Sequence, residues 1–102
     1  MMKYLAYIIA GCLSWPMLAQ AHYPVMDCQK NQTAISCRIG FSDGTFALGS
    51  EVVMYTYEDQ VIARAIADGS STAHFAWQEG DFYIQFDAGH EDPAEFDSAE
   101  LE

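Results

Sequence analysis

The stretch "TAISCRIGF", Thr33–Phe41, decides the fold class of this chain. Its large apolar residues alternate with small or polar ones, the period of two that is typical of a strand with one buried face. The residues predicted to face inward are Ile35, Cys37, Ile39 and Phe41. A strand of this kind needs other strands to cover its apolar face.

Further along the chain, short segments rich in β-branched and aromatic residues recur about every ten residues. Each is separated from the next by a cluster of turn-forming residues such as Ser-Asp-Gly or Glu-Gly-Asp. The predicted strands cover residues 51–57, 61–67, 73–77 and 82–87. This spacing predicts a small antiparallel β-sandwich, immunoglobulin-like or transthyretin-like, with no convincing helix.

Residues 1–21 have the order expected of a secretory signal peptide: a basic start at Lys3, an apolar run, then small residues up to Ala21. The apolar run is too short for a transmembrane anchor, which needs about 20 residues. Cleavage after Ala21 would make His22 the first residue of a periplasmic protein that is not inserted in the membrane. The alternative is a lipoprotein, because residues 9–12 match a lipobox that ends at Cys12.

The mature chain of 81 residues predicts one domain, residues 22–97, followed by an acidic tail, residues 98–102. In an exported protein, the remaining pair Cys28 and Cys37 is expected to form a disulfide rather than a thiolate metal site. Closing this loop would stabilise so small a domain by roughly 2.5 to 3 kcal/mol in the chain-entropy model.

Charge and motifs narrow the function classes. The mature chain keeps three basic residues against fifteen acidic ones, a net charge of −12. Nucleic acid and anionic lipid are therefore poor partners, whereas cations and basic protein surfaces are better ones. The chain has no Gly-x-Ser-x-Gly elbow, Gly-rich phosphate loop or Cys-x-x-Cys motif, so we do not expect an enzyme.

The histidines carry the most specific signal. A free N-terminal His22 can close a chelate ring on one metal ion with its α-amine and imidazole Nδ1, donors that suit Cu²⁺ and Ni²⁺ and, less strongly, Co²⁺ and Zn²⁺. In "DAGHEDP", residues 87–93, His90 stands next to Glu91 and Asp92, which together offer nitrogen and oxygen ligands. His74 is a weaker candidate, because it is expected to point outward from its strand.

Four segments resemble a known family: Ala21-His22, "GFSDGTFALGSEVVMY" at 40–55, the reversal through 61–75, and "GDFYIQFDAGHEDPAEF" at 80–96. They are similar to small periplasmic accessory proteins of energy-coupling-factor type nickel and cobalt uptake systems. The resemblance implies an extracytoplasmic protein that binds Ni²⁺ or Co²⁺ through His22 and His90 and delivers it to an inner-membrane permease. The cysteine pair departs from that family.

Two alternatives remain open at this point. One is a metal-free interaction module of a secreted or membrane assembly, whose acidic face or edge strands dock on a larger partner. The other is a periplasmic copper carrier, because an N-terminal histidine also suits Cu²⁺.

Overall fold

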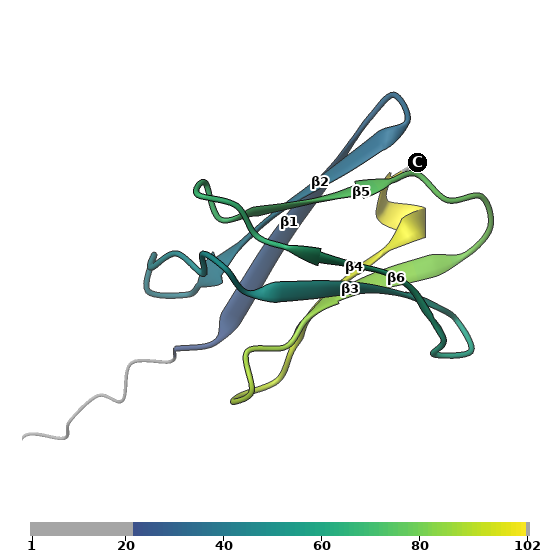
Figure 1. The fold of residues 1–102 in the computed structure, drawn as a ribbon. Helices are drawn as coiled ribbons and strands as arrows, with labels where there is room; N and C mark the ends of the chain where they lie inside the picture. The colour runs from purple at the N-terminus through teal and green to yellow at the C-terminus, as the bar shows by residue number, and fades with distance from the viewer. Residues whose placement is uncertain (1–21, 102) are drawn as a thin grey trace, which may run out of the picture.

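The computed structural model describes residues 22–101, so the predicted signal peptide, its cleavage after Ala21 and the lipobox at Cys12 lie outside the described residues. Seven strands and one short 3-10 helix follow in order (Figure 1). They are β1 (Pro24–Asn31), β2 (Ala34–Phe41), β3 (Glu51–Thr56), β4 (Val61–Ile66), β5 (Thr72–Ala76), β6 (Phe82–Phe86), β7 (Ala94–Asp97) and η2 (Ser98–Leu101). Within residues 22–101, no helix has the length and apolar character to cross a bilayer.

The strands form two sheets, which confirms the predicted antiparallel β-sandwich. One sheet has the order β1-β2-β5, and the other has the order β4-β3-β6-β7. All neighbouring strands run antiparallel. The turn between β1 and β2 sits at Gln32, whose φ of 61° fits the left-handed conformation that tight hairpins use. The alternation predicted for "TAISCRIGF" is therefore the alternation of β2.

The core lies between the sheets, and the disulfide is part of it. Cys28 pairs with Cys37 across β1 and β2, and their sulfurs are 2.08 Å apart, which confirms the predicted bond. From the larger sheet, Phe82 and Phe86 are almost fully buried against the same interior. The rest of the buried cluster is Ile35, Ile39, Ala47, Val52, Met54, Ala67, Ala73, Phe75 and Ile84.

Two strands and the end of the chain differ from the sequence expectation. The polar strand β1 and the short acidic strand β7 carried no clear apolar alternation, yet both border their sheets. Residues 98–101, predicted as a solvated tail, form η2, and Ser98 is 2% exposed. Its hydroxyl accepts a hydrogen bond of 3.1 Å from the backbone N–H of Phe82. This contact ties η2 to the first residue of β6.

A buried serine joins the β2, β3 and β5 regions and gives a first prediction. The Ser71 side chain is fully buried; its hydroxyl donates to the Ile39 carbonyl at 2.5 Å and accepts from the Ala47 N–H at 2.8 Å. Ser71→Ala leaves both groups unpaired, so we expect it to lower the free energy of unfolding by about 2 kcal/mol. Urea denaturation measures this. Exposed Ser70→Ala is the control, and an equal loss in both variants would contradict the account.

Candidate metal site at one end of the sandwich

Three separate segments meet at one end of the sandwich. They are the two described residues before β1, the turn after β2 and the loop between β6 and β7 (Figure 1). The first two are joined by two hydrogen bonds: the Ser42 N–H donates to the Tyr23 carbonyl at 2.9 Å, and the Tyr23 N–H donates to the Ser42 hydroxyl at 3.1 Å. This pairing holds the backbone next to His22 against the turn.

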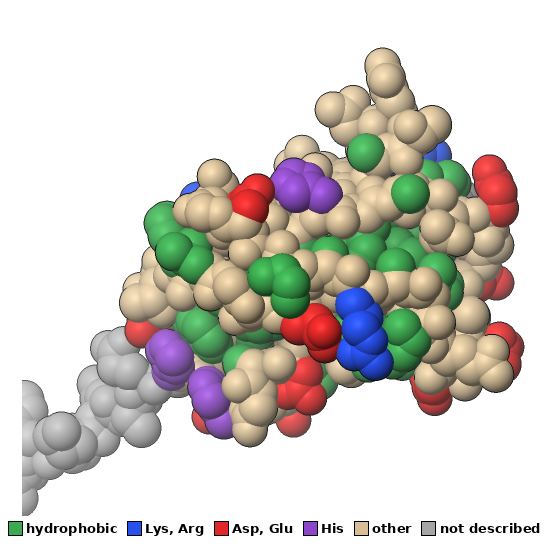
Figure 2. All heavy atoms as spheres, in the orientation of Figure 1, with side chains coloured by type: hydrophobic (Ala, Val, Ile, Leu, Met, Phe, Trp, Pro, Cys, Tyr) green, Lys and Arg blue, Asp and Glu red, His purple; other side chains and the backbone are tan. Residues whose placement is uncertain are grey.

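The structure places the rings of His22 and His90, the two histidines predicted as main ligands, close to each other. Their ring centroids are 5.7 Å apart and their planes differ by 23°. Both rings stack on Phe41, at 4.4 Å for His22 and 6.0 Å for His90. Phe41 itself packs edge-on against buried Phe86, so Phe41 connects the two histidine rings to the core. Figure 2 shows histidine side chains gathered beside acidic ones at this end of the molecule.

Asp43 is the residue of this site that the sequence interpretation missed. Its Oδ2 lies 3.4 Å from His22 Nε2. Its Oδ1 accepts hydrogen bonds from the Thr45 N–H at 3.0 Å and the Thr45 hydroxyl at 2.8 Å. These two bonds, first the one from the backbone, hold the pKa of Asp43 below its usual value, and a positive charge on His22 acts in the same direction. Asp43 is thus an anchored anion beside the His22 ring.

A signal for Asp43 was present in the sequence but needed the strand register. In the β1–β2 ladder, Pro24 stands opposite Phe41 and Cys28 opposite Cys37. Extending that antiparallel register by two residues places His22 opposite Asp43. The sequence pattern does not predict β1 as a strand, so without this register residues 42–45 indicate only a turn.

Glu91 and Asp92 directly follow His90 in the loop between β6 and β7. Together with Tyr23 and Pro24 they line an open hollow of about 330 Å³ beside the start of β1. Among the described residues, neither carboxylate forms an ion pair with His22 or His90. Their role as ligands stays a prediction.

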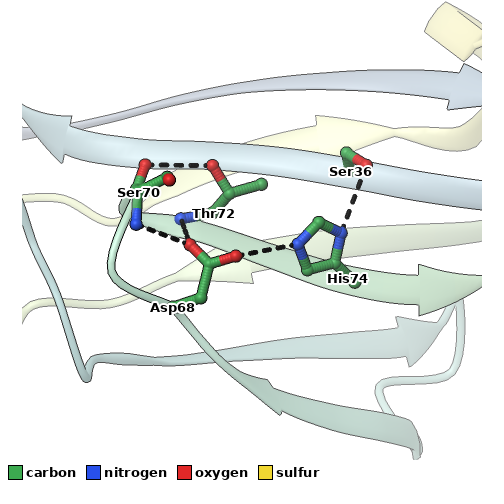
Figure 3. A network of polar contacts seen from close by, with 5 residues as sticks. All are labelled: Ser36, Asp68, Ser70, Thr72 and His74. Carbon is green, nitrogen blue, oxygen red and sulfur yellow. Dashed lines mark hydrogen bonds and ion pairs between the residues drawn. The ribbon is translucent and has the colours of Figure 1, made fainter.

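His74 lies elsewhere. It stands on β5 opposite Ser36, exposed on the outer face of the smaller sheet, as predicted (Figure 3). Its Nε2 is 3.0 Å from Asp68 Oδ2, and its Nδ1 is 3.3 Å from the Ser36 hydroxyl. In a catalytic pair, a serine hydroxyl lies about 2.6 to 3.2 Å from the histidine that activates it. The contact between Ser36 and His74 is longer than that. The structure does not bring His74 to the other two histidines.

The Asp68–His74 contact predicts an acid-dependent contribution to stability. The His74 hydrogen bond, followed by the N–H groups of Ser70 and Thr72, lowers the pKa of Asp68 below 3.8. A carboxyl whose pKa falls on folding stabilises the fold above its ordinary pKa and loses that contribution as the pH drops through the folded value. We expect Asp68→Asn to lower the melting temperature at neutral pH, with the difference from wild type shrinking below pH 3.8. A difference that stays constant in thermal scans from neutral pH to strong acid would contradict this.

The contacts at this end join two imidazoles and one carboxylate, those of His22, His90 and Asp43. Among residues 22–101, no three His, Cys, Asp or Glu side chains are arranged as a ready metal site. Comparison with known proteins adds no family to this description. No protein-family model, curated protein or solved structure matches the chain.

Proposed function

We propose that the mature protein binds a divalent transition metal, Ni²⁺ or Co²⁺, in the periplasm and hands it to an inner-membrane uptake permease. The metal ligands are the α-amine and Nδ1 of His22, released by cleavage after Ala21, with His90 as the third ligand. The observation that supports this most is the stacking of the His22 and His90 rings, which come from opposite ends of the domain sequence.

The contact with Asp43 supports one particular mode of binding. A chelate through the amine and Nδ1 leaves Nε2 of His22 free, and Nε2 is the nitrogen that faces Asp43. Metal-bound histidines commonly donate the N–H of the other ring nitrogen to a carboxylate, which orients the ring and raises the basicity of the ligand. Asp43 is therefore a positioning residue in this proposal.

The ring separation is close to what one ion requires. An ion bound about 2 Å from one nitrogen of each imidazole holds the ring centroids roughly 4.5 to 5.5 Å apart. The observed 5.7 Å is close to that range, but the two rings are stacked with their planes 23° apart, so at least one ring must rotate to point a nitrogen at the shared ion. His22 is 43% exposed, which suits a site that must release its metal to another protein.

The role of Asp43 can be tested separately from the ligands. Asp43→Asn keeps the size of the side chain and removes its charge, so we expect Ni²⁺ affinity to fall about 10-fold, the lower end of effects seen for groups that orient ligands. Thr45→Val, which removes one hydrogen bond to Asp43, should give a smaller loss in the same direction. Titration calorimetry on the mature protein measures both.

The matched control is Asp81→Asn, an acidic residue in the turn before β6. It changes the net charge by the same amount and should leave affinity within about twofold of wild type. Equal losses at Asp43 and Asp81 would mean that general charge, not the orientation of His22, drives the effect.

A copper carrier is the nearest alternative, because the same amine and imidazole donors bind Cu²⁺ more strongly than Ni²⁺. Delivery to a nickel or cobalt permease is supported by the family resemblance alone. A metal-limited growth assay of a deletion strain separates the two: restoration by added Ni²⁺ or Co²⁺ favours uptake of those metals, and restoration by added copper favours the carrier.

A further inference from the structure

The outer face of the larger sheet carries two half-buried tyrosines, and an exposed tyrosine follows β3. Tyr55 and Tyr83 stand opposite each other on β3 and β6, with ring centroids 5.1 Å apart and planes 21° from parallel. Tyr57, just beyond β3, is 48% exposed. Exposed aromatic side chains that gather on one sheet face are a common feature of binding surfaces.

Two hollows flank the stacked pair. The first, of about 520 Å³, is lined by Tyr57, Tyr83, Glu95, Asp97 and Glu100. The second, of about 290 Å³, includes Tyr55 together with Glu51, Arg64, Gln85 and Asp87. One member of the Tyr55–Tyr83 pair lines each hollow, so the stacked pair stands between them. We refer to these residues together as the tyrosine-acid face.

Tyrosine hydroxyls hold two carboxylates of this region in place, and one of these, Asp97, lines the first hollow. The Tyr57 hydroxyl donates to both oxygens of Asp97, at 2.7 and 2.8 Å, and the Tyr83 hydroxyl donates to Asp59 at 2.7 Å. The bond to Asp59 raises the pKa of Tyr83 to about 12, and the bond to Asp97 raises that of Tyr57. The phenols therefore stay protonated, and their bonds restrict the carboxylates before any ligand arrives.

The charge of the face is almost entirely negative. Among the described residues that line the two hollows, Arg64 is the basic one, and it lines the second hollow. Its guanidinium is already paired with Glu51 at 2.9 Å. The first hollow holds three carboxylates and two tyrosine side chains and no base. A ligand that complements this hollow carries positive charge and a flat surface.

We propose that the tyrosine-acid face docks an extended, arginine-bearing segment of a partner protein. A guanidinium stacks on aromatic rings and forms paired hydrogen bonds with carboxylates, which a lysine ammonium does not match. A segment that crosses both hollows places one arginine against Tyr57, Tyr83 and Asp97. The proposal does not depend on metal binding at the other site.

The test uses two capped peptides, one of alternating Gly and Arg and one of alternating Gly and Lys, titrated into the ¹⁵N-labelled protein at physiological salt. We expect the arginine peptide to shift amide signals of β3, β6 and β7 and to bind at least about fivefold more tightly than the lysine peptide. Tyr55→Leu, which keeps an apolar side chain, and Glu95→Gln should each weaken arginine-peptide binding by about fivefold or more.

Matched controls change the same residue types elsewhere. Tyr23→Leu lies near the histidines, and Glu79→Gln lies in the turn between β5 and β6. Both should stay within about twofold of wild type. The proposal is overturned if neither peptide binds, if the two peptides bind equally, or if the controls weaken binding as much as the variants of the face. Spectra of each variant confirm that it is folded.

Discussion

A glycine inserted before His22 is expected to weaken Ni²⁺ binding by the mature protein about 100-fold, or about 2.7 kcal/mol. The added residue turns the α-amine of His22 into a peptide nitrogen, which binds a metal ion only after it has lost its proton, so the chelate of amine and Nδ1 is no longer available. The side chains of His22, His90 and Asp43 are unchanged. Because only the chelate is lost, the comparison isolates the one donor that depends on cleavage after Ala21.

Calorimetric titration of the secreted protein, with its first residue verified by mass spectrometry, measures this effect. His22→Ala should cause a loss at least as large, and His90→Ala a smaller one, about 10-fold, because two donors remain on His22. His74→Ala is the matched histidine control, since His74 pairs with Asp68 on another face. Equal affinity with and without the added glycine would contradict the chelate and favour an interaction module.

Removal of the disulfide is expected to have the largest effect on stability. Cys28 and Cys37 close a loop of ten residues, and in the chain-entropy model the double variant Cys28→Ala/Cys37→Ala loses about 2.7 kcal/mol. Both positions are buried, at 4% and 0% exposure, so lost packing adds to that figure. For so small a domain, the loss is a large part of the total free energy of unfolding.

Urea denaturation of the oxidised, reduced and doubly substituted proteins measures the contribution. The reduced wild-type protein should lose the loop-closure contribution, and the double variant should unfold at a somewhat lower denaturant concentration still, because it also loses side-chain packing. If reduction left the midpoint unchanged, the bond would not restrain the unfolded chain to a useful degree. The backbone hydrogen bonds between β1 and β2 would then be sufficient to hold these two strands together.

The sequence predicts the strands whose apolar residues alternate, and it misses those whose partners supply the burial. In β2 and β6, every second residue is large and apolar, so one face is defined without knowledge of the neighbours. β1 has mixed polarity, and its place follows from the hairpin register and the Cys28–Cys37 bond. β7 is four residues long, and only Ala94 and Phe96 mark its inner face.

The same reasoning explains the candidate site. His22 and His90 were chosen from their chemistry, one at a predicted cleavage site and one in an acidic loop, and the fold places their rings together. Asp43 lies opposite His22 because of the register between β1 and β2, and the amino-acid composition does not reveal that register. The tyrosine-acid face joins residues from β3, β6 and β7 and depends on which strands are neighbours. Sheet order of this kind is set by the whole fold rather than by any local pattern.

The most direct measurement is a crystal structure of the mature protein grown with Ni²⁺, with anomalous differences recorded at the nickel absorption edge. The account predicts one strong peak about 2 Å from the α-amine and Nδ1 of His22, with His90 as a further ligand and Nε2 facing Asp43. A peak on His74 and Asp68, or no peak near His22 in crystals whose first residue is free, would contradict it.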